Sequence, residues 1–185
     1  TSDCNQSLVD AAWYCDPKGV ESALLLGADP NYVPPSGWPP LLGVALKCRW
    51  GIDAIKSAKL LVSAGADLTY TNSLGQTALS LAVETGCFQL VQFLLEQGAD
   101  VRVKANADNP LEKTSRKEFV ELLLRYGADP FEVGMSGHSA FEECQADISE
   151  LLSLVPLDEH ETQRLEELRE IVRMMMNWLS YRSMP

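Results

Sequence analysis

Apolar residues recur along the chain at the spacing of short amphipathic helices. In residues 78–97, two stripes of apolar side chains are separated by Gly86. Steps of three and four residues place each stripe on one helical face. The pattern therefore predicts two short helices joined by a turn at the glycine. The first stripe holds Leu79, Ala82 and Val83, and the second holds Leu90, Val91, Leu94 and Leu95.

The second of these stripes belongs to a pattern that ends four times in the tripeptide Gly-Ala-Asp. Its glycines, Gly27, Gly65, Gly98 and Gly127, lie 38, 33 and 29 residues apart. A glycine after the last apolar turn can adopt a positive φ and end the helix. Because one helix pair cannot bury its own stripe, we expect about three or more units to stack into one core. The four strings are ALLLGADPN at 23–31, LLVSAGADL at 60–68, LLEQGADVR at 94–102 and LLLRYGADP at 122–130.

This unit resembles the ankyrin repeat, whose usual length is about 33 residues. A second family feature, a Thr-Pro-Leu-His-like turn into the first helix, is best preserved in GQTALSLAV at 75–83, where Thr77 can cap a helix. The resemblance implies an all-α fold, an ankyrin-repeat solenoid of helix-turn-helix units with hairpin-like fingers. In the family, the histidine of this turn normally supplies a hydrogen bond between repeats. The histidine is absent from every copy in this chain, so that bond is not assured. Its place is taken by Leu42, Ser80, Glu112 and Glu142.

We expect a repeat array over residues 1–155 and a capping helix in 156–185. Residues 7–15 look like the first helix of a degenerate unit, with Trp13 covering that end of the core. Extra residues around 48–53 predict a longer loop between the helices of the second unit. The fourth unit has too few residues for a full first helix, which should therefore be short. The array units are predicted at about 4–35, 36–71, 72–105, 106–134 and 135–155.

The last predicted helix covers residues 159–181 and begins at a capping-box-like pair, Asp158 and Glu161. Its apolar residues follow alternating steps of three and four. This stripe either covers the last repeat as a cap or forms a dimer, and two heptads are short for a coiled coil. We therefore expect a monomer, with dimerisation through 159–181 as the alternative. The stripe holds Leu165, Leu168, Val172, Met175 and Leu179, widened by Ile171 and Trp178.

Charge narrows the choice of partner. The net charge of -11 would repel a phosphate backbone, so nucleic acid is not expected as a partner. Ten acidic residues against Arg164 and Arg169 give residues 142–170 a net charge of -8. This acidic stretch is either a solvated helical face or a docking site for a basic partner.

The cysteines and the hydropathy pattern indicate the redox state of the thiols and the cellular location of the chain. Cys4, Cys15, Cys48, Cys87 and Cys144 are far apart and form no C-x-x-C pair, so we expect reduced thiols and no metal or cofactor. No apolar run reaches the roughly 18 residues that span a bilayer, and no signal-peptide layout is present at the N-terminus. These features predict an intracellular, cytoplasmic protein without a membrane partner; a nuclear location is also compatible.

Catalytic signatures are not found in the sequence. It has no phosphate-cradling glycine loop, no nucleophile elbow and no histidine pair on a helix. The two histidines, His138 and His160, fall in different predicted elements and do not assemble a nucleophile with its base. We expect a protein without enzymatic activity and with no catalytic residues.

Recognition of another protein is the function that remains. In ankyrin-type proteins, the fingers and the exposed side of the first helices form a concave face that binds folded partners, and the resemblance implies the same for this chain. Trp and Tyr often dominate interface energies, so Tyr32, Trp38 and Tyr70 are the leading candidates, although Trp38 could instead pack on the neighbouring prolines. The candidate contact residues are Tyr32, Trp38, Trp50, Tyr70, Gln76, Glu84, Thr85, Arg102, Lys104, Asp108, Met135 and His138.

Two other functions fit the same pattern. The chain could be a stoichiometric inhibitor or neutralising antagonist of an enzyme, with acidic residues 142–170 entering a basic cleft. Some ankyrin proteins are adaptors in ubiquitin ligation through a C-terminal recruiting box, but residues 156–185 show no such box. Binding that weakens with salt would favour the acidic mechanism over the concave face.

Overall fold

The computed structural model describes residues 2–48, 51–102, 108–134, 136–153 and 157–182. Three predicted contact residues, Trp50, Lys104 and Met135, lie outside this described part. The described elements are helical, which confirms the all-α prediction, and an isolated antiparallel bridge pairs Val133 with Ser139. The chain divides into unit 1, Thr1–Asp100, and unit 2, Val101–Pro185.

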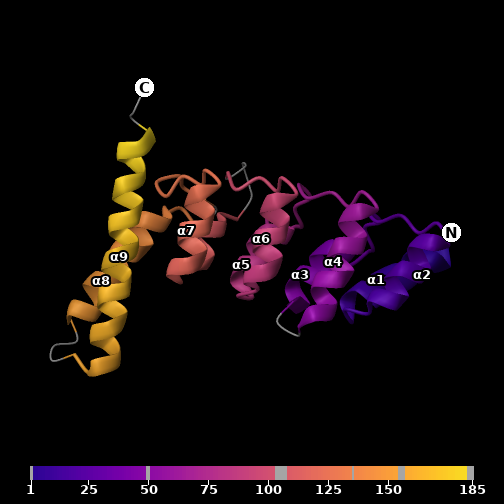
Figure 1. Ribbon diagram of the computed structural model, residues 1–185, viewed down its shortest axis with the longest axis horizontal. Coiled ribbons are helices and arrows are strands. Elements are labelled where there is room, and N and C mark those ends of the chain that lie inside the picture. The colour runs from indigo at the N-terminus through magenta and orange to yellow at the C-terminus, as the bar shows by residue number, and fades with distance from the viewer. Residues whose placement is uncertain (1, 49–50, 103–107, 135, 154–156, 183–185) are drawn as a thin grey trace. The chain divides into compact units, whose positions relative to one another are not determined.

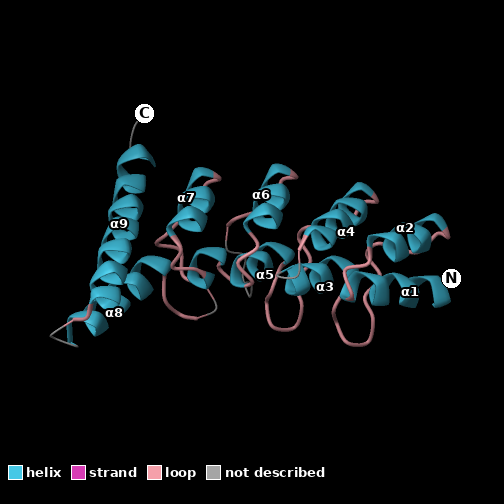
Figure 2. Cartoon of the chain, turned by 60° about the horizontal axis from the view of Figure 1, so that its bottom comes forward, coloured by secondary structure: helices cyan, strands magenta, loops and turns pink. Residues whose placement is uncertain are grey.

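The described residues of unit 1 form three helix pairs, whose order along the chain can be followed in Figures 1 and 2. The first helices α1, α3 and α5 pack on one another in sequence, and so do the second helices α2, α4 and α6. Small side chains at the contacts, such as Ala45, Ala58 and Ala82, are fully buried and let neighbouring helices approach closely. The bounds are α1 Ser2–Trp13, α2 Pro17–Leu25, α3 Pro40–Lys47, α4 Ile52–Ser63, α5 Ala78–Glu84 and α6 Phe88–Glu96.

The four Gly-Ala-Asp corners share one backbone geometry. Each corner glycine has a φ between 85° and 91°, where a residue with a Cβ would be strained. The glycine N–H donates to the carbonyl three residues back, and the alanine N–H donates to the carbonyl five residues back, at 2.9–3.0 Å. This is the Schellman pattern, and it ends each preceding helix as predicted. The four corner glycines are Gly27, Gly65, Gly98 and Gly127.

In the part of unit 2 that the structure describes, a 3₁₀ turn, η2 (Pro110–Lys113), precedes the helices α7 (Lys117–Arg125), α8 (Ala140–Ser153) and α9 (Glu159–Arg182). The short η2 confirms the predicted shortening of the fourth unit's first helix. Helix α9 packs against both α7 and α8. Its buried side chains are Leu165, Leu168, Ile171 and Met175.

Both predicted helix starts are capped as expected. Thr77 and Ser80 form a capping box at α5. At the start of α9, the Asp158 N–H donates to Glu161 Oε2 at 3.0 Å, and the Glu161 N–H donates to Asp158 Oδ1 at 2.7 Å. These side chains satisfy N–H groups that the first helical turn leaves without partners.

A disulfide joins Cys48 and Cys87, so the expectation of reduced thiols was wrong for these two residues. Cys48 follows α3 and Cys87 precedes α6, so the bond links the second and third helix pairs. Their Cα atoms are 6.0 Å apart, within the usual range for a disulfide. Both cysteines occupy the helix–helix turn of consecutive repeats, and stacking brings these turns together. Cys4, Cys15 and Cys144 are free thiols.

The described residues contain neither a helix able to span a membrane nor a cluster able to hold a metal ion. No helix among them is long and apolar enough to cross a membrane. Within the same residues, no three His, Cys, Asp or Glu side chains gather in a way that could hold a metal ion.

Candidate partner-binding site

The leading predicted contact residues of unit 1 lie on two finger segments, 26–39 and 64–77, which link one helix pair to the next. An aspartate shapes the start of each finger. The Asn31 N–H donates to Asp29 Oδ1 at 2.9 Å, and the Thr69 N–H donates to Asp67 Oδ1 at 2.7 Å. These Asx turns fix the direction in which each finger leaves its helix.

Asparagine side chains bind two Gly-Ala-Asp corners in unit 1, and Asn31 binds the corner of the next repeat. The Asp29 N–H donates to Asn5 Oδ1 at 2.8 Å, and the Asp67 N–H donates to Asn31 Oδ1 at 2.6 Å. The Asn31 side-chain amide also donates to the Gly65 carbonyl at 2.9 Å. The chain therefore has hydrogen bonds between repeats although the family histidine is absent. Sequence reasoning missed this role; the only signal was an asparagine two residues after the first Gly-Ala-Asp.

Trp38 belongs to an aromatic cluster at the base of the first finger. Its ring meets Trp13 edge-on, with centroids 6.3 Å apart and an interplanar angle of 80°. The Lys47 ammonium lies 4.8 Å from the Trp13 ring centroid, a cation–π contact. Both indoles are half-buried. We call Trp13, Trp38 and Tyr70 the aromatic cluster of unit 1.

The position of Trp13 differs from the prediction. It was expected to cover the open N-terminal end, but its ring contacts Trp38 and lies beneath Lys47, on the side of α3. Gly43 of α3 makes room for it, since a Cβ there would lie 3.4 Å from Trp13 Cε3. Tyr14, which directly follows α1, is instead 81% exposed.

The tyrosines of the fingers are half-buried and anchored by polar contacts. The Tyr70 hydroxyl donates to the Gly37 carbonyl at 3.4 Å, which ties the second finger to the base of the first. The Tyr32 N–H donates to the Asp29 carbonyl at 3.1 Å. Trp38 and Tyr70 therefore lie close together on the fingers, on either side of Gly37.

The predicted residues around α5 form a polar border. Gln76 is held by Asn72, whose Oδ1 accepts from the Gln76 N–H at 2.9 Å. The Gln76 side-chain amide reaches Glu84 Oε2 at 3.5 Å, and Glu84 is exposed. The Thr85 hydroxyl lies 2.9 Å from the Leu81 carbonyl and 3.3 Å from the Ala45 carbonyl of α3. Its contacts are therefore with backbone, within its own helix and across to the neighbouring pair.

In unit 2, the described contacts do not bring the predicted residues together. Asp108 pairs with Lys113 at 3.2 Å. Arg102 is exposed and lines a groove with α7 and α9. His138 is exposed, and its backbone N–H donates to Ser136 Oγ at 3.2 Å. The site therefore rests on unit 1.

Two of the residues that replace the family histidine are structural in unit 2. Glu112 accepts from the Gly134 N–H at 3.0 Å and from the Ser136 hydroxyl at 2.8 Å. Glu142 accepts from the Ser139 N–H at 2.8 Å and from its hydroxyl at 3.0 Å, and these bonds lower the pKa of Glu142. Glu112 thus holds the loop at 134–136, and Glu142 holds the start of α8 at Ser139.

The acidic stretch 142–170 is largely solvent-facing. Most of its carboxylates are exposed, and its ion pairs, such as Arg169 with Glu166 at 2.9 Å, are surface pairs. Exposed pairs contribute little to stability. Lys117 of α7 pairs with Glu170 at 2.5 Å, which raises the pKa of Lys117 and lowers that of Glu170. The surface therefore keeps a negative field that a basic partner would meet.

Comparisons with known proteins follow the same repeats. A family model described as ankyrin repeats, in three copies, matches residues 8–105 and 48–133. An ankyrin repeat protein of Acanthamoeba polyphaga mimivirus is 37% identical over 81 residues, which are 41% of this chain and 20% of that protein. A second ankyrin repeat protein of the same virus is 29% identical over 102 residues, 52% of this chain and 62% of that protein.

A mammalian protein matches over a similar length. The B-cell lymphoma 3 protein homolog of Mus musculus is 39% identical over 83 residues, 42% of this chain and 18% of that protein. The matched segments thus span between 18% and 62% of these three relatives.

Proposed function

The chain belongs to the ankyrin-repeat family, and from this premise we propose that it binds a partner protein through the fingers and first helices of unit 1, without enzymatic activity. Ankyrin repeats are generally modules of protein–protein interaction. The aromatic cluster of unit 1 is the centre of the proposed contact, and Gln76 and Glu84 form its polar border. This assignment concerns unit 1 alone.

The observation that supports the proposal is that the cluster is both held in place and half-exposed. Trp13 is positioned by Lys47 and α3, Trp38 packs edge-on against Trp13, and Tyr70 is tied to Gly37. Rigid, partly exposed aromatic residues lose little entropy on binding, and Trp and Tyr are common interface hot spots. A side chain that only filled the core would be fully buried.

The test begins with affinity capture from native extract using the full chain, followed by mass spectrometry. The captured partner is then titrated calorimetrically against wild type and against Trp38→Ala with Tyr70→Ala. We expect the double variant to bind at least about tenfold more weakly, since hot-spot truncations cost about 2 kcal/mol or more.

A matched control separates this face from a general loss of aromatic surface. Tyr14→Ala removes an exposed tyrosine that follows α1 and lies outside the aromatic cluster, and it should change the affinity by less than about twofold. Circular dichroism and urea unfolding verify that each variant is folded. If the double variant binds the partner as tightly as wild type, the proposed face is wrong.

The inhibitor or antagonist function is a second candidate, and the exposed carboxylates of residues 142–170 favour it. In that case the partner would be an enzyme with a basic cleft. Raising the ionic strength should then weaken binding strongly, because exposed charges are screened within about 8 Å at physiological salt. Binding that is nearly independent of salt would count against this function.

We also propose that residues 156–185 cap the repeat array and that the protein is a monomer. Burial of Leu165, Leu168 and Met175 within unit 2 supports this, because a dimer through α9 would need that stripe to face outward. Light scattering of the full chain tests it, and a dimeric mass would contradict the monomer. The intracellular location stays a prediction of the sequence.

A further inference from the structure

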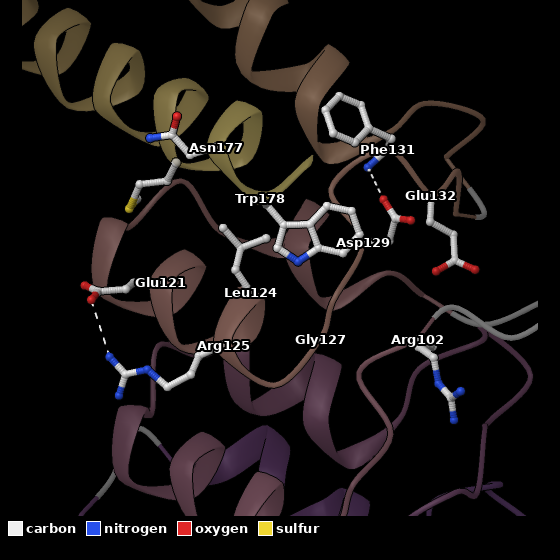
Figure 3. A pocket seen from close by; sticks show the side chains of 11 residues that line it. Arg102, Glu121, Leu124, Arg125, Gly127, Asp129, Phe131, Glu132, Asn177 and Trp178 are labelled. Atoms are coloured by element: carbon white, nitrogen blue, oxygen red, sulfur yellow. Dashed lines mark hydrogen bonds and ion pairs between the residues drawn. The ribbon is translucent and has the colours of Figure 1, made fainter. Parts of the chain in front are cut away.

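Unit 2 contains an open groove of about 1140 Å³ between α7, α9 and the segment that follows α7 (Figure 3). Its apolar lining comes from Leu124, Phe131, Met174 and Trp178. In Figure 3 the indole of Trp178 lies beside Leu124 and the stretch from Asp129 to Phe131. All of these apolar residues are half-buried, so the groove presents apolar surface to solvent.

The groove arises from a difference in helix length. Helix α7 ends at Arg125 and the chain turns away at Gly127, whereas α9 continues to Arg182. The turn of α9 that carries Trp178 therefore faces the Gly-Ala-Asp corner at Gly127 instead of a further turn of α7. Met174 and Trp178 lie one helical turn apart on α9, and both line the groove.

The rim of the groove is polar and more acidic than basic. Glu121, Asp129 and Glu132 line it together with Arg102 and Arg125. Arg125 pairs with Glu121 at 3.4 Å, so this pair cancels one charge of each sign. Residues 101–185 hold sixteen acidic and ten basic residues, so the surrounding field is also negative. An apolar ligand with positive charges at its edges would match both the floor and the rim.

We propose that this groove docks an amphipathic segment of a partner protein, in which bulky apolar side chains are flanked by lysine or arginine. The apolar side chains would lie on Trp178 and Met174, and the basic residues would face the acidic rim. Methionine suits such a surface because its flexible side chain adapts to different apolar anchors. The inference extends the proposed function, since it adds a second contact surface, on the other unit.

The test uses defined peptides and the full chain. A fluorescent peptide of roughly 14 residues, about four helical turns, carries a leucine stripe and lysines elsewhere. One control peptide replaces every lysine by glutamate, and another replaces every leucine by serine. Fluorescence anisotropy should show that the leucine–lysine peptide binds wild type at least about tenfold more tightly than either control.

The chain offers a matched pair of methionines on α9. Met174 lines the groove, whereas Met176 lies outside its lining and is 48% exposed. Met174→Ala and Trp178→Ala should each weaken binding of the leucine–lysine peptide about tenfold, and Met176→Ala by less than about twofold. Equal effects of the two methionine substitutions would overturn the proposal, and so would equally tight binding of the leucine–glutamate peptide.

A cross-linking measurement avoids any effect of substitution on folding. A leucine–lysine peptide that carries benzoylphenylalanine is irradiated with the wild-type chain, and the linked residues are mapped by mass spectrometry. Cross-links to Met174 or to neighbouring groove residues are expected. Cross-links confined to unit 1 would refute the groove.

The outcome also separates this proposal from the function proposed for unit 1. The Trp38→Ala with Tyr70→Ala variant should bind the leucine–lysine peptide as wild type does. If that variant abolishes peptide binding, the peptide occupies unit 1 and the groove proposal fails, while the unit 1 proposal gains support. If the groove variants alone abolish it, the groove proposal stands whatever the fate of the unit 1 face.

Discussion

Removing the side-chain amide of Asn31 should weaken the coupling between consecutive repeats. Asn31 accepts from the Asp67 N–H at 2.6 Å and donates to the Gly65 carbonyl at 2.9 Å. A net hydrogen bond contributes about 0.5–1.5 kcal/mol, and the exposed position of Asn31 favours the lower half of that range. We therefore expect Asn31→Ala to lower the free energy of unfolding by about 1–2 kcal/mol.

The prediction has an internal standard in the preceding repeat. Asn5 makes one equivalent bond, from the Asp29 N–H at 2.8 Å, so Asn5→Ala should cost about half as much as Asn31→Ala. Asn177→Ala, at an exposed position on α9, should change stability by less than about 0.5 kcal/mol.

Urea unfolding followed by tryptophan emission measures these differences. Three of the four tryptophans lie in residues 1–100, so the emission reports mainly on unit 1. The midpoint should fall while the m-value is unchanged, because the same surface is exposed on unfolding. If Asn31→Ala loses no more stability than Asn5→Ala, the asparagine does not couple the repeats as argued.

Two further predictions concern buried polar groups. Ser57 is fully buried and its hydroxyl has no hydrogen-bond partner, so Ser57→Ala should leave the thermal midpoint unchanged or raise stability by about 1 kcal/mol. Burial raises the pKa of Cys144 from 9.0 to about 11, so the unfolded thiol ionises first as the pH rises. The free energy of unfolding should therefore fall by about 1–2 kcal/mol between about pH 9 and pH 11. Urea unfolding over this pH range measures the fall, which should be smaller for Cys144→Ala than for wild type.

Local features of the fold could be predicted because their causes lie within a few residues. A glycine after an apolar stripe fixed the four helix ends, since a residue without a Cβ adopts the positive φ found there without strain. Asp158 with Glu161 marked the start of α9, and the shortage of residues before Arg116 indicated the short η2. Each inference needed only the sequence of one repeat.

Features that depend on the distance between repeats were not predictable in this way. Cys48 and Cys87 are 39 residues apart, and their pairing appears only once the helix–helix turns of two repeats are superposed in a stack. The role of Asn31 depends on the same superposition, because it binds the corner of the next repeat, whereas Asn5 binds the corner of its own helix pair. Of the leading candidate-site residues, Trp38 and Tyr70 were predicted from residue type and register, whereas Trp13, which packs on Trp38, was expected to cover the N-terminal end of the core.

Helix length decides where each unit can offer a ligand surface. In unit 1 the second helices have 9, 12 and 9 residues, so neighbouring second helices are of similar length. In unit 2 the 9-residue α7 lies against the 24-residue α9. The longer helix must extend past its neighbour, and the amphipathic stripe that buries Leu168 and Met175 continues into that extension as Trp178. The same periodicity that closes the core of unit 2 thus also builds the floor of its groove.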